Sequence, residues 1–565
     1  PPAPRAGTAG AGAGVRGGEA GPAAAPEVMG ATSGSLEARS LLPERTAGRL
    51  RVVVLGSGWG SCAFMKALQA DGAYDVVLVS PRNFFLYTPL LPGAAVGSVE
   101  ERSIVEPVRK IIAGKGEYLE AQCIGVDPEA KRITCRAADV ASEAGRLGRS
   151  CPWHSFELDY DYLVVGVGAV PNTFGVPGVR RYCSFFKEID DASRFRADVT
   201  ERFERALLPN TPDQRIRELL TFVVVGAGPT GVELAAELHD MVREDVAKLF
   251  PPRLTEFVSI KIVDQMDSIL STYDRRISEY ATKHFAREGI DMLLNTAVKE
   301  VGDGVITLQD RAGGEPYCLP FGVCVWAAGV KPNDLVQQIM EKLPEGTQTN
   351  FRALTTDKML RVKGSGGSIY AFGDCSTIER PNSLACAERL YGDRDRTIDL
   401  KEFERVLTEG SKEFPHLEEL LKRAQSDDDS IEVQRLQLGA EIDFEAFQQL
   451  LRREDDQLRA LPATAQVAKQ EAEYLAQSFD SAGGDAEKLR QTPTKFTYAH
   501  KGSLAYIGAD AAVLDIPGMG VIRGLAAGFI WKSFETFSQF SIRNQILVLS
   551  DLVRAKVFGR DTSAI

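Results

Sequence analysis

Three glycines, Gly226, Gly228 and Gly231, have the spacing with which proteins bind the pyrophosphate of a dinucleotide. They follow residues 222–225, an apolar run that predicts a buried strand, and precede a helical run of Glu, Leu and Ala. The first glycine permits a tight turn, the second lets the backbone approach phosphate, and the third lets the helix pack on its strand. A strand-to-helix turn without a ligand is the alternative interpretation.

An acidic residue, Asp264, ends the next predicted strand, residues 258–263. A carboxylate at this position accepts a hydrogen bond from a ribose hydroxyl of the dinucleotide. It also repels the additional phosphate of NADPH, so the pattern favours NADH.

A second glycine loop follows the predicted strand of residues 51–55. Gly56 and Gly58 fit the fingerprint, but its third position is Ser61, and Gly60 comes one residue early. Ser80 stands where the ribose-binding acid is expected. Two nucleotide loops in one chain suggest an electron-transfer pair, in which one nucleotide is a bound flavin and the other a passing nicotinamide.

Two further segments, DYLVVGVGAVPN with Gly168 and VCVWAAGVKPN with Gly329, share a closing pattern. Each resembles a strand that returns the chain to its own nucleotide unit, so the two halves repeat. Two unrelated strand ends are the alternative. Gly373 and Asp374 also end a predicted strand, where an acid can reach the ribityl hydroxyls or pyrophosphate of FAD, although the dipeptide alone is typical of a turn.

The composition of the chain argues against several other classes of protein function. The chain has 565 residues, 44% of them hydrophobic, and its net charge of −12 argues against nucleic-acid binding. Nine cysteines occur without a CxxC pair or a metal-like cluster, as in a reducing compartment, and we predict no metal site. No run of eighteen apolar residues predicts a membrane-spanning helix.

Several longer motifs narrow the interpretation: SPRNFFLYTPLLPGAAVG, GAGPTGVELAAEL, WAAGVKPN, AFGDC, LPATAQVAKQEAEYLA and KGSLAYIG. Together they resemble the flavoproteins with two dinucleotide-binding domains and a glutathione-reductase-like α/β fold. Within these, they resemble the type II NADH:quinone oxidoreductases. The resemblance covers residues 51–378 and 457–565, and TPLLP and ATAQVAKQEAEYLA are more specific to this family than either glycine loop.

The resemblance implies a set of site residues. FAD would be held by Gly56, Gly58, Gly60, Ser80, Arg82, Thr88, Pro89, Leu90, Gly168, Gly373 and Asp374. NADH would be held by Gly226, Gly228, Gly231, Asp264 and Gly329. Glu233 would lie near the nicotinamide, and Ala465 and Gln466 beside the isoalloxazine, where the quinone arrives. The alternatives are that Glu233 serves only the helix dipole and that Gln466 is only a polar residue at a helix N-terminus.

The implied reaction passes two electrons from NADH through FAD to a membrane quinone of the ubiquinone class, without proton pumping. The cysteines argue against two relatives of the same architecture, disulfide reductases and sulfide:quinone reductases, because both need paired cysteines. Only Cys62 lies after the first glycine loop, and Cys375 has no obvious partner and is expected to serve packing.

Residues 379–456 form an acidic insert with 20 acidic and 12 basic residues up to residue 455. Its segments TIDLKEF and EIDFEAF resemble the second halves of two EF-hand loops, and such loops share a β-bridge, expected between Ile398 and Ile442. An acidic, solvated helical excursion with chance loop similarity is the alternative.

The ligand positions of the two loops make calcium doubtful. In the first loop, Tyr391 takes position one and Arg396 replaces the glycine of the sharp turn. In the second, Ala446 replaces the bidentate Glu. We therefore expect an EF-hand-like helical pair without high-affinity calcium binding in its second loop and with doubtful binding in its first, which can still dock a partner protein.

The chain ends differ from its middle. Residues 1–50, rich in Ala, Gly and Pro, predict a disordered tail with a possible targeting remnant. Residues 516–565 hold an aromatic stripe of Leu525, Phe529, Trp531, Phe534 and Phe537 among basic side chains. Such a segment can lie on an anionic membrane, or it can bury the stripe in a homodimer or against the flavin domain.

These features give a domain plan. An FAD-binding domain takes residues 51–190, 350–378 and 457–515, and an NADH-binding domain takes residues 191–349. We expect a peripheral enzyme of the mitochondrial inner membrane. The rivals are a flavoprotein of the same fold with a soluble or protein acceptor, and a non-catalytic nucleotide-binding scaffold.

Overall fold

The computed structural model describes residues 45–69, 72–138, 155–380, 382–414, 417–418, 420–421, 441–457 and 460–561. All of them belong to the unit Arg45–Ile565, to which the following description applies. Residues 1–44, where most of the predicted tail falls, lie outside the described residues.

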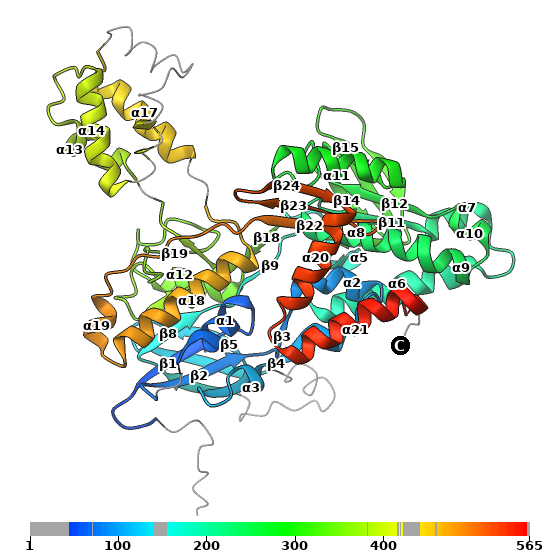
Figure 1. Cartoon of the computed structure of the whole chain (residues 1–565), viewed down its shortest axis with the longest axis horizontal. Coiled ribbons are helices and arrows are strands. Elements are labelled where there is room, and N and C mark those ends of the chain that lie inside the picture. The colour runs from blue at the N-terminus through cyan, green and yellow to red at the C-terminus, as the bar shows by residue number, and fades with distance from the viewer. Residues whose placement is uncertain are drawn as a thin grey trace, which may run out of the picture. The chain divides into compact units, whose positions relative to one another are not determined.

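A seven-stranded sheet forms the first nucleotide unit, in the order β20-β8-β1-β2-β5-β6-β7. Its strands are β1 (Leu50–Leu55), β2 (Tyr74–Ser80), β5 (Glu117–Asp127), β6 (Arg132–Ala137), β7 (Ser155–Asp159), β8 (Tyr162–Val165) and β20 (Ile369–Ala371). The five strands from β20 to β5 are parallel, and β6 and β7 extend them antiparallel. Apolar runs such as β8 are buried throughout, as expected of parallel strands covered on both faces. Helix α1 (Trp59–Ala67) packs against α18 (Ala465–Ala482), and both are visible over this sheet in Figure 1.

A five-stranded parallel sheet forms the second unit, in the order β10-β17-β11-β12-β13. Its strands are β10 (Ser184–Phe185), β11 (Thr221–Val225), β12 (Ser259–Val263), β13 (Asp291–Leu293) and β17 (Val323–Trp326). Its helices are α6 (Ile189–Ala206), α8 (Pro229–Met241) and α11 (Arg275–Glu288), and α8 continues through a π turn, Val242–Val246, into α9 (Ala247–Leu249). A meander of β14 (Thr296–Gly302), β15 (Val305–Asp310) and β16 (Tyr317–Pro320) is inserted before β17. Because β10 pairs with β17, the second sheet starts a few residues before the predicted boundary at 190.

Two short strands join the nucleotide units. β9 (Ala169–Pro171) follows β8, β18 (Val330–Pro332) follows β17, and the two pair antiparallel with each other. Gly168 and Gly329 stand before them with φ of +64° and +65°, a conformation that favours glycine. The shared closing pattern of the two repeats thus marks segments that contact one another.

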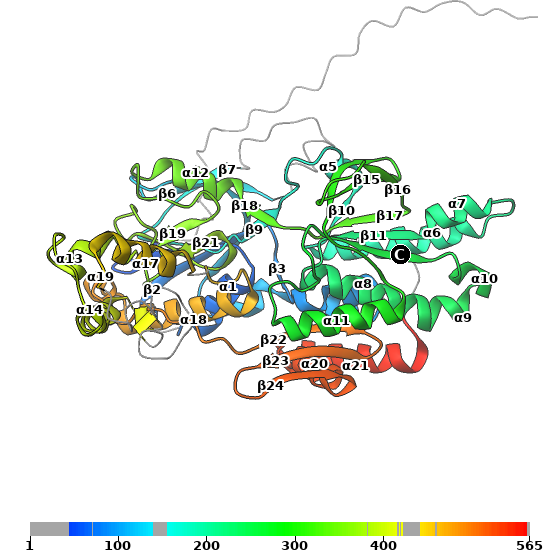
Figure 2. The ribbon, with the colours of Figure 1, turned by 90° about the horizontal axis from the view of Figure 1, so that it is seen from above.

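The C-terminal region is a small sheet with two helices. It contains β22 (Ser503–Gly508), β23 (Ala511–Ile516), β24 (Gly520–Gly524), α20 (Leu525–Phe537) and α21 (Ile542–Phe558). β22 packs on α8, β23 on α11, and α20 covers β23, so these elements form a layer under the second unit in Figure 2. The layer therefore begins near residue 503, ahead of the predicted boundary at 515.

A buried ion cluster fastens the end of the chain to the second unit. The Arg560 guanidinium, about 10% exposed, lies 2.8 Å from carboxylate oxygens of Glu244 and Asp245. It also lies 4.0 Å from Glu237 of α8. Removing one side of such a cluster leaves buried charge uncompensated, which typically costs 3–5 kcal/mol. Among the described residues, no helix is both long and apolar enough to cross a membrane.

The insert has a core of its own. Its helices are α13 (Ala387–Tyr391), α14 (Leu400–Glu413) and α17 (Phe444–Gln457). Tyr391, Phe403 and Phe447 are fully buried between them. Ile398 and Ile442 exchange two backbone hydrogen bonds of 2.9 Å, so the predicted β-bridge is confirmed. The EF-hand identity of the insert stays a prediction.

Candidate functional site

The two glycine loops are built alike. The Gly56 amide donates to the Val79 carbonyl at 2.9 Å, and the Gly226 amide donates to the Val263 carbonyl at 2.8 Å. Their φ angles are +99° and +111°. A Cβ atom on Gly56 would lie 2.4 Å from the Gly166 carbonyl oxygen, so the loop tolerates no side chain there.

Open space lies beside the second glycine of each loop. A Cβ atom on Gly58 or Gly228 would meet no protein atom within 4 Å. These glycines are the N-caps of α1 and α8, and no side chain caps either helix. The free N–H groups of both first turns can therefore bind a pyrophosphate. The residues present fit FAD at the first loop and NADH at the second.

The third position differs between the loops for reasons of packing. A Cβ on Gly231 would lie 1.9 Å from the Gly226 carbonyl oxygen. Ser61 is tolerated at the corresponding place because it is fully buried and its hydroxyl donates to the Leu55 carbonyl at 3.1 Å. A Cβ on Gly60 would overlap the Phe372 ring at 2.4 Å, so the early glycine lets α1 approach the AFGDC segment.

The residues at the ends of β2 and β12 both bind back to their glycine loops. The Asp264 carboxylate accepts hydrogen bonds from the amides of Ala227 (2.5 Å) and Met266 (2.8 Å). The Ser80 hydroxyl donates to the Ser57 hydroxyl at 3.0 Å. Asp264 thus lies beside the second glycine loop, where a ribose-binding acid is needed.

The side chain of Arg82, expected near the adenosine end of FAD, is held by three residues, Ser57, Phe84 and Glu188. Its Nε donates to the Phe84 carbonyl at 3.1 Å, and its guanidinium forms an ion pair with Glu188. The sequence gives no signal for Glu188, which is 106 residues away.

The TPL segment, expected at the flavin ring, forms a 3-10 turn, Thr88–Leu90. The Trp59 indole N–H donates to the Thr88 hydroxyl at 3.1 Å, which ties this turn to the first glycine loop. Thr88 is exposed and Pro89 half-buried, but the Leu90 side chain is buried in the core. Thr88 and Pro89 are therefore the members that remain accessible to a ligand.

A buried glutamate supports the Gly-Asp pair of the AFGDC segment. Glu471 of α18 accepts a hydrogen bond from the Gly373 amide at 2.7 Å. Burial raises the pKa of Glu471 to about 7. Lys187, whose Nζ lies 4.0 Å from the Asp374 carboxylate, donates to the Ala169 carbonyl at 2.5 Å. Neither Glu471 nor Lys187 was predicted. The sequence feature that could have indicated Glu471 is an acidic residue on the apolar face of the helix that contains ATAQVAKQEAEYLA.

Gln466 has all of its side-chain groups engaged. Its Oε1 accepts hydrogen bonds from the Tyr498 hydroxyl (2.7 Å) and the Lys501 amide (2.8 Å), and its Nε2 donates to the Gly502 carbonyl at 3.3 Å. Gln466 therefore positions the segment that leads into β22. Ala465, half-buried, is the first residue of α18, behind the capping hydroxyl of Thr464. The roles of both residues toward quinone and flavin stay predictions.

Glu233 lies in the first turn of α8 and reaches the C-terminal layer. Its Oε1 accepts a hydrogen bond from the Tyr506 amide at 3.1 Å. Desolvation raises the pKa of Glu233 well above its usual value, and the nearby carboxylates of Glu535 and Glu237 add to this. Glu233 therefore contacts the C-terminal layer in addition to lying near the positive end of the helix dipole.

Two pairs of cysteines each lie close together in space, although neither pair is next to a glycine loop in the sequence. Cys183 and Cys324 have their sulfur atoms 3.4 Å apart at the second sheet. Cys123 and Cys135 face each other across β5 and β6. Cys375 is buried, donates to the Val165 carbonyl at 3.3 Å and has its pKa raised to about 12 by burial, in agreement with packing.

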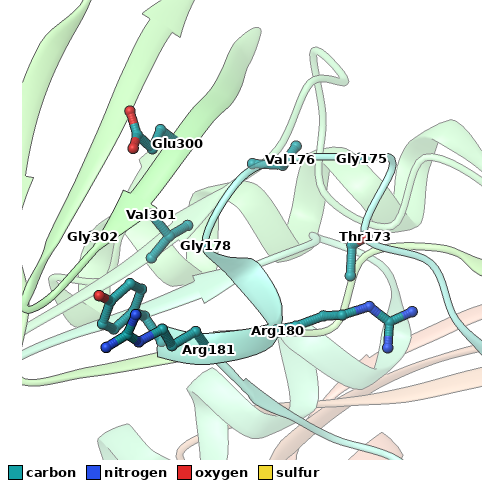
Figure 3. A pocket seen from close by; sticks show the side chains of 10 residues that line it. Thr173, Gly175, Val176, Gly178, Arg180, Arg181, Glu300, Val301 and Gly302 are labelled. Carbon is teal, nitrogen blue, oxygen red and sulfur yellow. The ribbon is translucent and has the colours of Figure 1, made fainter.

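A cavity of about 550 Å³ opens between α5 (Val179–Tyr182) and β14. It is lined by Thr173, Gly175, Val176, Gly178, Arg180, Arg181, Tyr182, Glu300, Val301 and Gly302. In Figure 3 the Arg180 side chain extends away from that of Arg181. None of the predicted site residues lines this cavity.

The first EF-hand-like loop is closed by a cation of the protein. Arg396 places one guanidinium nitrogen 2.9 Å from the Glu402 carboxylate and another 2.9 Å from the Tyr391 carbonyl oxygen. The Tyr391 hydroxyl points into the core and donates to the Ile442 carbonyl at 2.6 Å. Arg396 therefore holds together the two ends of the loop, as calcium does in an EF-hand. Over the described ranges, no three acidic, His or Cys side chains are placed to hold a metal ion.

Comparison with known proteins assigns most of the chain. Residues 50–389 match the pyridine nucleotide-disulphide oxidoreductase family, and residues 500–561 match the NDH2 C-terminal domain. The mitochondrial external alternative NAD(P)H-ubiquinone oxidoreductase B2 of Arabidopsis thaliana is 38% identical, with 91% of this chain and 90% of the relative covered. The mitochondrial external alternative NADH-ubiquinone oxidoreductase of Yarrowia lipolytica is 35% identical, with 91% and 80% covered.

Solved structures agree with this assignment. NDH2 of Plasmodium falciparum in complex with NADH matches with a TM-score of 0.77 and 29% identity, over 91% of this chain and 100% of that one. The sulfide:quinone oxidoreductase of Aquifex aeolicus, at a TM-score of 0.56 and 15% identity, shares the fold. The predicted α/β flavoprotein fold is confirmed.

Two glycine-to-alanine variants test the nucleotide sites separately. Because neither new Cβ lies within 4 Å of a described protein atom, both variants should fold and, without bound nucleotide, keep the wild-type melting temperature. We expect Gly58→Ala to lower the bound FAD and Gly228→Ala to weaken NADH binding about tenfold, roughly 1.4 kcal/mol, since each methyl group enters phosphate space. Absorbance of the purified protein and NADH titration measure the two effects. Variants with wild-type binding of both nucleotides would contradict this assignment.

Calcium should not act on the insert. We expect calcium to leave the melting temperature of the full chain unchanged, and Asp393→Ala to have no effect on that result. Arg396→Gly should destabilise the insert by about 1 kcal/mol or less, because the Arg396–Glu402 pair is partly exposed. Scanning calorimetry with calcium or a chelator measures both. Tight calcium binding that Asp393→Ala abolishes would show that the first loop is functional.

Proposed function

The chain belongs to the pyridine nucleotide-disulphide oxidoreductase family, in its type II NADH dehydrogenase branch, and on this premise we propose that it passes two electrons from NADH through bound FAD to a ubiquinone-class quinone. No proton pumping accompanies the transfer. The observation that carries the proposal is the pair of uncapped helix N-termini over open space at Gly58 and Gly228. One chain thereby offers two dinucleotide sites.

The protein contributes binding and positioning to this reaction. FAD, when bound, supplies the hydride acceptor for NADH and the two-electron donor for the quinone. The first turn of α1 binds its phosphates, and Glu471 holds the Gly373 turn so that Asp374 can bind ribityl hydroxyls. The Thr88–Leu90 turn, fixed by Trp59, would help to hold the flavin ring. Fixed geometry of this kind sets the rate of a direct hydride transfer.

NADH is the proposed donor. Asp264 accepts two backbone hydrogen bonds and lies beside the second glycine loop. Its carboxylate can bind the ribose hydroxyls of NADH and repels the additional phosphate of NADPH. Glu233 is proposed to contact the nicotinamide end.

The outer face of the C-terminal helices is proposed to rest on the membrane. The exposed apolar side chains there are Leu525, Phe529, Ile530, Phe534, Phe537, Ile542, Ile546, Leu549, Val553, Val557 and Phe558. Such an apolar surface on paired helices is typical of interfacial binding. Trp531, which was expected in this stripe, is about 4% exposed and faces inward against the Tyr506 ring. The stripe prediction was wrong for this residue.

Apolar contacts, more than charge, should drive this binding. Lys532 and Lys556 form ion pairs with Asp510, and Arg554 pairs with Glu100. These cations are already compensated, which weakens their attraction to anionic lipids. A quinone dissolved in the bilayer would enter from this face.

The relatives are mitochondrial enzymes described as external. We place this chain at the mitochondrial inner membrane as a peripheral protein on its outer side. A homodimer and a partner protein at the acidic insert are further elements of the proposal.

Spectroscopy tests the reaction. The purified protein should be yellow, should bleach when NADH is added anaerobically, and should regain its colour when a short-chain quinone follows. Bleaching without reoxidation by quinone would indicate a different acceptor. A colourless protein that takes up no FAD would contradict the enzymatic assignment.

Vesicle sedimentation tests the membrane face. Phe529→Ser with Phe537→Ser should weaken binding to phosphatidylcholine vesicles at least about tenfold, because burying a Phe side chain contributes roughly 1.5–3 kcal/mol. Phe351→Ser is the control, since Phe351 is about 86% exposed but lies outside these helices. If the wild type fails to bind vesicles and the double variant instead dissociates a dimer, the face is a subunit interface.

A further inference from the structure

The inner face of α20 carries a row of buried polar side chains. Trp531, Glu535 and Gln539 follow one another at spacings of four, so they lie on one face of the helix and its C-terminal extension. All three are nearly fully buried, and Glu535 is about 1% exposed. Burying polar groups costs free energy unless they form hydrogen bonds, so the burial of each of these three side chains requires an explanation.

The hydrogen bonding of these three side chains is incomplete. The Tyr87 hydroxyl donates to Glu535 Oε2 at 2.7 Å, and Tyr87 is itself buried. Gln539 Nε2 donates to the backbone carbonyl of Glu535 at 2.9 Å. Gln539 Oε1 and Trp531 Nε1, however, are buried and have no hydrogen-bond partner among the described residues. An unused donor one turn before the Glu535 carboxyl and an unused acceptor one turn after it fit a polar ligand beside this acid.

The row lies next to the proposed flavin site. Tyr87 directly precedes the Thr88–Leu90 turn. The Trp59 ring contacts Tyr87 with centroids 5.1 Å apart and also donates to Thr88. On the other side, Glu233 lies close enough for the Glu535 carboxylate to raise its pKa. Glu535 is therefore between the proposed flavin turn and the proposed nicotinamide residue, on the helix whose outer face is apolar.

Reduction of the quinone at this place needs one proton that NADH does not supply. Reduction of a quinone to a hydroquinone takes two electrons and two protons, and NADH brings two electrons and one proton as a hydride. The second proton must come from the protein or from solvent. We propose that Glu535, acting with Tyr87, delivers this proton to the quinone. The inference rests on the proposed function.

The step balances without another reactant. The O–H bond of the protonated Glu535 carboxyl breaks and an O–H bond forms on a quinone oxygen, while NADH supplies the electrons by way of the flavin. Tyr87 can relay the proton by giving its own hydroxyl proton to the quinone and taking that of Glu535. The carboxylate then regains a proton from solvent. The Trp531 indole N–H is available to donate to the quinone carbonyl.

The surroundings keep the acid protonated near neutral pH. Burial raises the pKa of Glu535 to about 7, although the Tyr87 hydrogen bond opposes this rise. The titratable groups that face it are Tyr87, Glu233 of α8 and Tyr273 ahead of α11, and none of these three is a cation. The carboxyl therefore carries its proton below about pH 7 and loses it as pH rises.

Half-reactions of the full-length, FAD-loaded protein separate this inference from the proposed function. Bleaching by NADH and reoxidation by a short-chain quinone are followed by stopped flow in the wild type, Glu535→Gln, Glu535→Asp and Tyr87→Phe. We expect bleaching to be unchanged in the three variants, and reoxidation to fall about 10²-fold in Glu535→Gln, the usual contribution of an acid catalyst. Glu535→Asp should keep most of the rate. Ser533→Ala, whose side chain hydrogen-bonds only within α20, is the matched control.

The pH profile and an infrared titration decide between proton delivery and structural support. Wild-type reoxidation should fall tenfold per pH unit above about pH 7, and Glu535→Gln should be slow and independent of pH. Infrared spectra of the protein without quinone should show buried carboxyl intensity that titrates near pH 7. Part of this intensity should be lost in Glu535→Gln, where the buried Glu471 still contributes.

Reoxidation of Glu535→Gln at the wild-type rate and with the wild-type pH profile would overturn the inference and leave the proposed function intact. A wild type that NADH bleaches but quinone does not reoxidise would overturn the function itself.

Discussion

The antiparallel pairing of β9 with β18 is the contact on which the relation between the two nucleotide units depends. Gly168 and Gly329 turn the chain out of each parallel sheet with positive φ, and the strands that follow bind one another. The backbone N–H of Asn172 donates to the backbone carbonyl of Gly329 at 3.2 Å, and the Trp326 indole N–H donates to the backbone carbonyl of Asn172 at 2.9 Å. Each return strand is thus held by the opposite unit. Because dinucleotides bind at the carboxyl ends of parallel strands, a contact made just beyond those ends fixes one binding edge relative to the other.

A row of acids on α8 holds the C-terminal layer to this frame. Glu233, Glu237 and Asp240 share one face of the helix, and all three contact residues from distant parts of the chain. Burial raises the pKa of Glu237, against the opposing charge of Arg560. Burial also acts on Asp240, but hydrogen bonds from His239, Tyr506 and the Ala509 amide outweigh it and lower its pKa. One face of one helix therefore carries acids whose pKa values are shifted in opposite directions.

Local patterns predicted the parts of the site that depend on backbone geometry. The two glycine loops, Asp264 and the Gly373 turn are each determined within a few residues, and the structure places them at the ends of the predicted strands. Glu471 and Glu535 were not predicted, because their partners are 98 and 448 residues away. Helical periodicity assigns a charged residue to the solvent, and this assumption fails for both. Trp531 is also buried, although it was placed in the exposed stripe, because aromatic residues occupy both faces of α20 and spacing alone does not tell which face is buried.

The position of Glu233 and Glu535 has a consequence for reduction of the quinone. Adding two electrons to a quinone without protons would place negative charge beside Glu233 and Glu535 in a region of low dielectric constant, where repulsion between like charges is strong. Desolvation raises the pKa of both carboxyls, that of Glu535 to about 7, which favours proton uptake and so reduces that repulsion before the electrons arrive. The same protonation stores a proton at the point where the charge develops. The outer face of α20 exposes Phe529 and Phe534, and its inner face buries Glu535. A single helix therefore joins an apolar surface suited to a bilayer with the acid whose ionisation the reaction must control.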